Sequence, residues 1–308
     1  MENKLHISWS PHIHSSNSTM RTMLDVIIAL VPASVAAVIL FGIPALLVIA
    51  VCVVSAVAGE ALFNLAINKE QTIGDLSAVV TGLILALNLP ANIPLWQAAV
   101  GSLFAIIIVK GIFGGLGKNI VNPAIAARVF MLIAFGSMTA AVFPKGLDAT
   151  SGATPLAELA QDKALNLMDL FLGKCGGALG ETCALALLIG GVYLIVRKVI
   201  TWHIPVAFIG TTFLFTLALE GGNFETTLAW VLSGGLMIGA FFMATDYVTS
   251  PSTVKGKLIF GIGAGVITVL IRFFGGYPEG VSFAILLMNI LNPYIDSLTP
   301  RKLFGGNK

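Results

Sequence analysis

A short hydroxyl-rich segment lies between two long apolar stretches of this chain. Residues 148–154 read DATSGAT and end on Thr154, directly before Pro155. A threonine hydroxyl can attack a phosphoryl group that an enzyme presents, provided that it lies on an accessible, flexible segment. Gly152 and Ala153 leave the backbone room, and Asp148 can help to hold a metal ion or the modifying enzyme. The segment therefore offers the Thr154 hydroxyl as a group that a modifying enzyme could reach.

The same seven residues resemble a known attachment signature, D-x-x-S-G-A-T, formed here by Asp148, Ser151, Gly152, Ala153 and Thr154. In proteins that carry this signature, a flavin transferase joins FMN to the last threonine through the phosphate. A structural interpretation stands beside it, because Thr154 as N-cap and Pro155 at the first position also start a helix. The two interpretations are compatible, since a capping threonine can still be modified.

The elements that must position this segment are apolar helices. Of 308 residues, 57% are hydrophobic and 10% are charged, against about 25% charged in soluble domains. We therefore predict an all-α polytopic membrane protein. The net charge of +2 does not suggest a nucleic-acid partner. Three cysteines without a CxxC pair are too few for an iron–sulfur cluster, and a structural zinc site is equally unsupported. Residues 1–22 are polar and lack the apolar core of a signal peptide.

About ten apolar segments are long enough to be read as membrane spans. They are 23–42, 43–67, 73–89, 95–116, 124–142, 177–197, 203–220, 226–246, 256–274 and 280–298. The third is short and is followed by Pro90 and Pro94, and its counterpart, the eighth, ends at MATDYVTSPST. Short or interrupted spans at matching places in two halves point to a binding site.

The two halves match at an offset of 161 residues. Pro90 falls on Pro251, Phe113 on Phe274, and Gly114-Gly115 on Gly275-Gly276. Five spans in each half would invert the second half relative to the first. We expect a polar arm (1–22), a first repeat (23–142), an outer loop (143–176), a second repeat (177–298) and a tail (299–308).

Lysines and arginines predict the orientation. With the N-terminus inside, thirteen basic residues fall on the inner side and four on the outer side. The inner ones are Lys4, Arg21, Lys69, Lys110, Lys118, Arg128, Arg197, Lys198, Lys255, Lys257, Arg301, Lys302 and Lys308. The outer ones are Lys145, Lys163, Lys174 and Arg272. Both termini are then cytoplasmic, and Thr154 faces the outside.

The whole chain resembles the D subunit of the Rnf complex, a membrane ferredoxin:NAD⁺ oxidoreductase, and more distantly the B subunit of the sodium-pumping NADH:quinone reductase. The resemblance rests on SPHIHSSNST, FGGLGKNIVNPAIAARVF, the attachment motif, MATDYVTSPST and YPEGVSFAILLMN. The short N-terminal arm favours the Rnf branch. The family implies ten spans in a prokaryotic inner membrane, an inverted repeat similar to that of urea transporters, covalent FMN outside, and a non-covalent riboflavin nearer the inner side.

Two inner-side segments are candidates for flavin contacts. GGLGKNIVNP holds Gly115 and Asn122, which let the backbone approach a ligand. TDYVTSP holds Thr249 and Ser250, whose hydroxyls suit an isoalloxazine ring or a cation. For both segments the structural interpretation is a turn and a helix start, with Pro123 at the first position of a helix.

Acids inside a membrane are costly and usually functional. Five lie within or at the ends of spans: Asp25, Glu60, Asp75, Asp246 and Asp296. We expect Asp246 and Asp296, which match acids in the family pattern, to handle the ion, with Glu60 on the same pathway. Asp25 and Asp75 can equally mark helix ends at the inner surface, and Glu181 is expected to be solvated at the outer surface. Phe242, with Phe241, can gate an ion path by dewetting or simply pack.

Arg272 is the remaining candidate on the outer side. It can pair with the FMN phosphate, for which its planar fork is suited, or anchor at the interface by pairing with Glu279. His12 and His14 stand at i and i+2 with nothing near them to complete a metal site, and His203 is expected at the surface.

These features together predict a subunit of a redox-driven Na⁺ or H⁺ pump. The resemblance implies an outer-side FMN-bearing subunit, cytoplasmic iron–sulfur and NAD-binding subunits, and a flavin transferase for maturation. The rival is a urea-transporter-like channel or carrier without flavin, and a third possibility is a structural scaffold.

Overall fold

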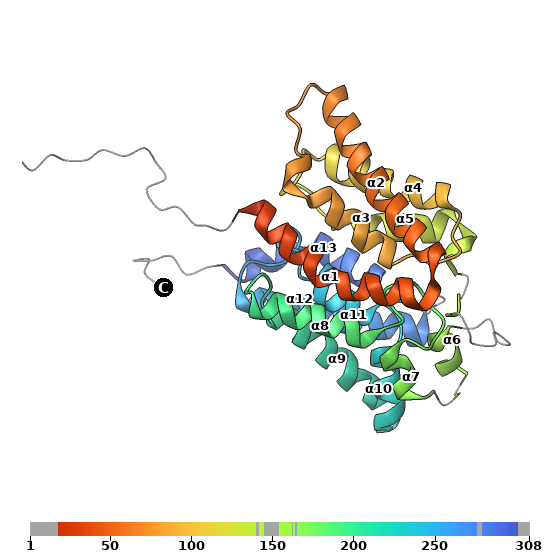
Figure 1. Cartoon of the computed structure of the whole chain (residues 1–308). Helices are drawn as coiled ribbons and strands as arrows, with labels where there is room; N and C mark the ends of the chain where they lie inside the picture. The colour runs from red at the N-terminus through yellow and green to blue at the C-terminus, as the bar shows by residue number, and fades with distance from the viewer. Residues whose placement is uncertain are drawn as a thin grey trace, which may run out of the picture.

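The computed structural model describes residues 18–139, 142–144, 154–161, 163, 165–275 and 279–300, and these residues form helices joined by short loops (Figure 1). The first half contains α1 (Thr19–Phe41), α2 (Ile43–Ala66), η1 (Ile73–Asp75), α3 (Ser77–Leu87), α4 (Leu95–Leu103), η2 (Phe104–Gly111), α5 (Pro123–Ala134) and η3 (Gly136–Thr139). Between the halves lie α6 (Pro155–Leu159) and α7 (Leu167–Leu172). The second half contains α8 (Ala184–Val196), α9 (His203–Leu219), α10 (Phe224–Leu232), α11 (Leu236–Ile238), η4 (Gly239–Met243), α12 (Val254–Phe274) and α13 (Val281–Leu298).

Each of the ten apolar segments contains a helix, but the helices differ in length. Four of them, α1, α2, α12 and α13, are long and apolar enough to cross a membrane. A fifth span results if α10 and the α11–η4 piece, which meet at 66°, count as one broken helix. Among the described residues the chain is thus all-helical with four to five apolar spans, as a polytopic membrane protein requires.

Local sequence explains where several helices begin. Ser18 caps α1 by accepting from the Arg21 amide at 3.2 Å, and Asn122 caps α5 by accepting from the Ala124 amide at 3.0 Å. Pro123 then occupies the first position of α5, as predicted.

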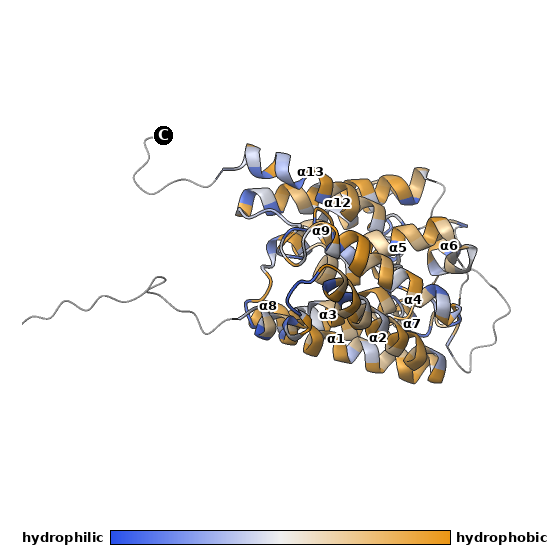
Figure 2. Cartoon of the chain, turned by 90° about the horizontal axis from the view of Figure 1, so that it is seen from above, coloured by the Kyte–Doolittle hydropathy of each residue, from blue (hydrophilic) through white to orange (hydrophobic). Residues whose placement is uncertain are grey.

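Apolar residues cover the outer faces of the helices, and polar residues concentrate toward their ends (Figure 2). Ile39, Val196, Phe274 and Leu298 are each more than 70% exposed. Exposed apolar side chains of this size along helices are what a lipid environment accommodates, since lipid tails are as apolar as the side chains themselves.

Helices from the two halves pack against each other through α1 and α8. A Cβ on Gly190 of α8 would lie 2.1 Å from the Ala29 carbonyl oxygen of α1, so the two backbones touch at this glycine. Small residues permit this close approach between membrane helices. Within the halves, α2 packs on α3 and α4, and α9 packs on α12.

Two helix ends inside the bundle are closed by polar groups. At the end of α3, the amides of Leu179 and Gly180 donate to the carbonyls of Leu89 and Leu87 at 3.0 and 2.6 Å. At the end of α10, Arg272 donates to the carbonyl oxygens of Trp230 and Ser233 at 2.7 and 3.1 Å. Backbone groups away from water need such partners, because each unsatisfied group costs several kcal/mol, roughly, in lipid.

Candidate functional site

α6, which begins directly after Thr154, lies at the end of the molecule that is opposite to the beginning of α1 and the end of α13 (Figures 1 and 2). We call this the α6 end and the opposite one the α1 end. Thr154 is the N-cap of α6, its Oγ1 accepts from the Ala157 amide at 3.4 Å, and Pro155 follows at the first position. The predicted cap is confirmed. The other predicted motif residues, Asp148, Ser151, Gly152 and Ala153, lie outside the described residues, as do His12 and His14.

Thr154 borders a small polar pocket at the α6 end. The pocket holds about 10 Å³ and is lined by Thr154, Pro155, Leu156, Cys175, Gly176, Glu181, Leu232, Ser233, Gly234 and Glu279. That is roughly the room of one water molecule, so a flavin ring on Thr154 would have to lie outside this pocket. Thr154 keeps part of its surface exposed, which suits a hydroxyl that an enzyme must reach.

A buried ion cluster centred on Arg128 lies behind the pocket. Arg128 of α5 donates to the Glu181 carboxylate at 2.7 Å and also to Glu279 and Asn88. Arg128 is 4% and Glu181 7% exposed. Two sequence expectations are corrected here. Glu181 is not solvated, and Arg128 does not lie at the inner surface. The two residues are buried together because each neutralises the charge of the other.

Glu279 shares Arg128 with Glu181, and it lies in the connection between α12 and α13. Burial raises the pKa of the Glu279 carboxyl to about 7, with Glu181 adding to the rise and Arg128 opposing it. One guanidinium thus faces two carboxyls, of which Glu279 is the more exposed.

Arg272 is buried rather than interfacial. It is 6% exposed, its two terminal nitrogens donate to the carbonyls of Trp230 and Ser233, and its Nε has no partner. The expectation that Arg272 anchors at the interface by pairing with Glu279 is wrong, since Glu279 bonds to Arg128. A Cβ on Gly234 would lie 3.0 Å from Arg272 Nη2 and 2.6 Å from Leu156 Cδ1, so Arg272 approaches the helix that Thr154 caps.

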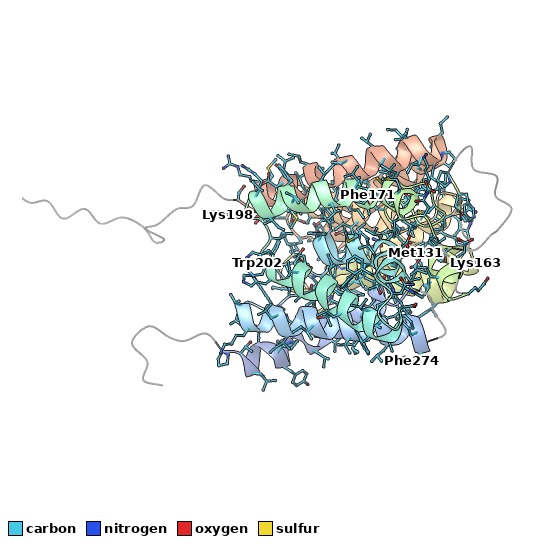
Figure 3. All side chains as sticks on the ribbon, turned by 90° about the horizontal axis from the view of Figure 1, so that it is seen from below. Met131, Lys163, Phe171, Lys198, Trp202 and Phe274 are labelled. Atoms are coloured by element: carbon cyan, nitrogen blue, oxygen red, sulfur yellow. The ribbon has the colours of Figure 1, made fainter. Side chains whose placement is uncertain are left out.

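A second pocket opens toward the α1 end. It holds about 90 Å³, and both halves of the chain line it, with Ser77, Lys110, Asn119 and Asn122 from the first and Phe241, Phe242, Thr245 and Asp246 from the second. Figure 3 places Lys198 and Trp202 at this end of the molecule and Lys163 and Phe274 at the other. The pocket is mainly apolar with a few converging polar groups, the composition typical of cofactor sites.

The predicted residues around this pocket stabilise turns. Asp246 accepts from the Thr249 hydroxyl at 3.2 Å and from the Val248 amide at 3.2 Å. Asn122 donates to the Met243 carbonyl at 3.3 Å and so ties α5 to η4. The amide of Asn289 on α13 donates to the Thr249 carbonyl at 3.2 Å. Gly115 lines a neighbouring pocket with φ +99°, and Ser250 donates its amide to the Asp246 carbonyl.

The other predicted acids are each hydrogen-bonded. Asp25 accepts from Tyr193 at 2.9 Å and from Arg197 at 3.3 Å, which joins α1 to α8. Asp296 accepts from the Ser252 amide at 3.1 Å, and Asp75 accepts from Ser77. These contacts place Asp296 among turn residues near the end of α13.

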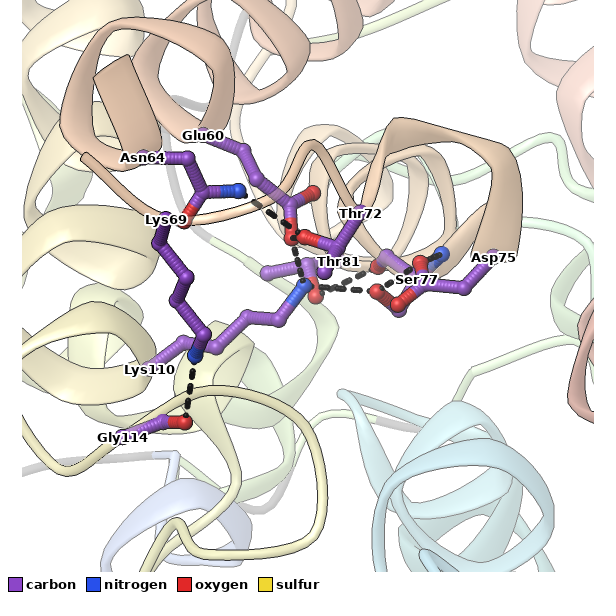
Figure 4. A network of polar contacts seen from close by, with 9 residues as sticks. All are labelled: Glu60, Asn64, Lys69, Thr72, Asp75, Ser77, Thr81, Lys110 and Gly114. Atoms are coloured by element: carbon purple, nitrogen blue, oxygen red, sulfur yellow. Dashed lines mark hydrogen bonds and ion pairs between the residues drawn. The ribbon is translucent and has the colours of Figure 1, made fainter.

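Glu60 belongs to a network of polar side chains, most of them buried or half-buried (Figure 4). Lys110 of η2 donates to Glu60 Oε1 at 2.7 Å and to Ser77 Oγ at 2.6 Å. Thr72 donates to the same Glu60 oxygen at 2.7 Å and accepts from Asn64 at 3.0 Å. Lys110, expected at the inner surface, is 3% exposed inside the bundle. No group of three metal-ligating side chains occurs within the described part of the chain.

Sequence reasoning missed Arg128 and Lys110 as site residues. Both sit inside apolar segments, at 124–142 and 95–116, and a basic residue there is as costly as an acid. Applying that rule to both signs of charge, instead of using basic residues only to count loops, would have marked Arg128 and Lys110 as candidate site residues.

Comparison with known proteins identifies what this chain is similar to. A family model described as NQR2, RnfD, RnfE family matches residues 6–305. The D subunit of the Na(+)-translocating ferredoxin:NAD(+) oxidoreductase complex of Acetobacterium woodii is 48% identical, covering 100% of this chain and 97% of that protein. The D subunit of the proton-translocating complex of Clostridium ljungdahlii is 44% identical, covering 97% and 96%. The D subunit of an ion-translocating oxidoreductase complex of Ectopseudomonas mendocina is 38% identical, covering 97% and 95%.

Proposed function

The chain belongs to the NQR2, RnfD, RnfE family, and on that premise we propose that it is the D-type membrane subunit of an ion-translocating ferredoxin:NAD⁺ oxidoreductase complex. In this role it carries electrons through the membrane part of the complex on flavin, and electron transfer drives Na⁺ or H⁺ across. The names of the full-length relatives support the complex and the reaction. The observation that carries the flavin is Thr154, the last residue of the attachment motif.

Thr154 would hold FMN through a phosphodiester to its hydroxyl. The support is the partly exposed position of this N-cap at the α6 end and the DATSGAT sequence that leads into it. When bound, FMN supplies one- and two-electron redox chemistry. The chain itself contributes the tether and, behind the pocket, the positive charge of Arg272, whose terminal nitrogens donate to backbone carbonyls rather than to a carboxylate.

A second, non-covalent flavin, riboflavin, is best accommodated by the pocket toward the α1 end. The rings of Phe241 and Phe242 offer apolar contact, and the amides of Asn119 and Asn122 offer hydrogen bonds. Gly115, Thr249 and Ser250 support this pocket from neighbouring turns. The two flavin sites would then lie toward opposite ends of the molecule, as transmembrane electron transfer requires.

We further propose ten spans arranged as two inverted repeats. The 161-residue offset places Asn88 on Thr249 and Arg128 on Asn289. In the first half Arg128 donates to Asn88, and in the second half Asn289 donates to Thr249. The same pair of positions is thus bonded in both halves, between α5 and the residue after α3, and between α13 and the turn after η4. This agreement supports the duplication.

Both termini are proposed to be cytoplasmic and the α6 end to face the outside of the cell membrane. Of the basic residues counted as outer, Lys163, Lys174 and Arg272 are described, and Arg128 joins them near the α6 end. Lys69, Lys198, Lys255 and Lys257 remain among the inner ones.

The ion is proposed to pass the acids Glu60, Asp246 and Asp296, with Phe242 beside Asp246. The other subunits of the complex are its partners, and a flavin transferase supplies the FMN.

Flavin fluorescence of the denatured, gel-separated chain tests this proposal. Wild-type chain produced with its transferase should fluoresce, Thr154→Ala should not, and Thr150→Ala, at a variable position of the same motif, should fluoresce like wild type. A wild-type chain without fluorescence would favour the channel or carrier. Full electron transfer in Thr154→Ala would favour a structural scaffold.

A further inference from the structure

We propose that the oxygens of Glu60, Thr72 and Ser77 form a site for a small monovalent metal cation, and that the ammonium group of Lys110 occupies this site in the present conformation. The inference rests on the proposed ion-translocating function for its role in transport. The existence of the site is a separate claim about this chain, and it is tested without electron transfer.

The oxygens around the Lys110 ammonium are those that a hard cation takes as ligands. Nζ lies 2.7 Å from Glu60 Oε1 and 2.6 Å from Ser77 Oγ. The Thr72 hydroxyl is held on the same Glu60 oxygen at 2.7 Å. These three groups come from α2, the loop before η1, and the start of α3, so three segments converge on one positive charge (Figure 4).

One ligand atom of the site has no partner. Glu60 Oε2 is buried without a hydrogen bond, and the whole residue is only 5% exposed. A buried carboxylate oxygen normally finds a donor, because leaving that hydrogen bond unmade is expensive. A metal ion can take both oxygens of a carboxylate, whereas the ammonium group here contacts only one.

The Lys110 ammonium also lies between two cavities. Lys110 and Ser77 line the 90 Å³ pocket toward the α1 end. Lys110 and Glu60 line the neighbouring pocket that also holds Gly115, here called the second cavity, which has a volume of about 150 Å³. Lys69, whose Nζ donates to the Gly114 carbonyl at 2.9 Å, stands at the second cavity. A cation that replaced the ammonium group would therefore be reachable from either side, and Lys110 would close the passage whenever it returned.

Lys110 is carried by an irregular helical turn. η2 (Phe104–Gly111) is a π-helix. This form is rare in proteins, and where it occurs it often lies at a functional site. The flexible stem of Lys110 can withdraw the ammonium group without moving the oxygens, which belong to other elements. The titratable groups of the network are Glu60, Asp75, Lys69 and Lys110, so removing Lys110 leaves Glu60 as the uncompensated buried charge.

Thermal unfolding of the purified full chain in detergent tests the site directly. The variants are Lys110→Met, Lys110→Met with Glu60→Gln, and Lys255→Met as an exposed control. Each is measured at alkaline and at acidic pH, in NaCl, LiCl or choline chloride of equal ionic strength. A cation that binds only the folded state raises the melting temperature with its concentration.

We expect the melting temperature of Lys110→Met to rise by several degrees with Na⁺ or Li⁺ over choline at alkaline pH. The rise should vanish at acidic pH, where protons compete with the cation for the ligand oxygens. The double variant, wild type and Lys255→Met should show no such difference. If Lys110→Met is recovered only when Na⁺ or Li⁺ is present throughout purification, that also supports the site.

Two outcomes would overturn the proposal. A Lys110→Met variant whose melting temperature depends on pH but not on the cation would show a site for a proton only. A Lys110→Met variant that cannot be recovered in any salt, while the double variant folds, would show a purely structural ion pair. Loss of flavin from Thr154 would leave all these measurements unchanged, so a failure of the proposed redox function is distinguishable.

Discussion

At the scale of the residue, the two features that define the candidate site are the buried ion cluster and the Thr154 cap. The sequence predicted the cap correctly, because Thr154-Pro155 is a strong local signal for a helix start. It predicted the acids but not their partners. Arg128 meets Glu181 across 53 positions and Glu279 across 151, and only the packing of α5 against distant segments creates such contacts.

The buried and the exposed arginine pairs should differ in their contribution to stability. Arg128→Met leaves Glu181 buried without a counter-charge and should lower the free energy of unfolding by about 3–5 kcal/mol. Arg197→Met, which breaks a pair whose arginine side chain is 50% exposed, should cost about 0–1 kcal/mol. Denaturant unfolding in detergent measures both. Equal losses in the two variants would contradict the buried cluster.

Glu279 should make stability depend on pH. Its pKa is raised from 4.5 to about 7 in the folded chain, so the folded state holds the proton more tightly than the unfolded state. The contribution of Glu279 to stability is therefore fully present below pH 4.5 and is lost as the pH rises through about 7, a difference of at most ~3 kcal/mol.

Glu279→Gln should flatten that part of the pH profile of the melting temperature, whereas Glu225→Gln, at an exposed position of α10, should leave it unchanged. The direction assigned to this carboxyl would be contradicted if the melting temperature of wild type, relative to that of Glu279→Gln, rose between pH 4.5 and 7.

At the scale of the element, apolar segments were predictable and their interruptions were not. All ten predicted segments contain helices, because a long apolar run is a strong signal. The breaks depend on particular contacts. α10 ends where the Arg272 side chain donates hydrogen bonds to the carbonyls of Trp230 and Ser233. The following turn passes through Gly234 at φ +69°. The local sequence of the eighth segment does not predict a contact with an arginine of α12.

Gly234 should tolerate no side chain. Gly234→Ala adds a Cβ in left-handed backbone, 2.6 Å from Leu156 and 3.0 Å from Arg272, and should cost about 1–3 kcal/mol. Gly210→Ala is the matched control, because it lies inside α9 with nothing within 4 Å of its Cβ, and it should be neutral or stabilising by about 0.5–1 kcal/mol. Thermal melts that rank the two variants the other way would contradict the turn described here.

At the scale of the whole molecule, orientation and duplication remain predictions that the fold supports. The Lys and Arg count suggested the sides, yet two of its inner members, Lys110 and Arg128, proved to be buried in ion pairs. The repeat offset came from prolines and glycines, and the bonded pairs at equivalent positions give it a physical basis. The family, by contrast, follows from the whole-length matches.

Impermeant thiol reagents test the orientation. In intact cells Lys163→Cys, near α6, should be labelled from outside, and Lys255→Cys, at the start of α12, should react only after the membrane is opened. The wild-type chain, with its buried or half-buried cysteines, is the blank. Labelling of Lys255→Cys in intact cells, with Lys163→Cys protected, would invert the proposed topology.

The central claim is that Thr154 carries the FMN of a redox-driven ion pump subunit. Mass spectrometry of the peptide containing Thr154, from chain purified out of an active complex, tests it most directly. We predict a mass increase equal to one FMN minus one water, located on the Thr154 hydroxyl. An active complex whose Thr154 peptide is unmodified would contradict this claim.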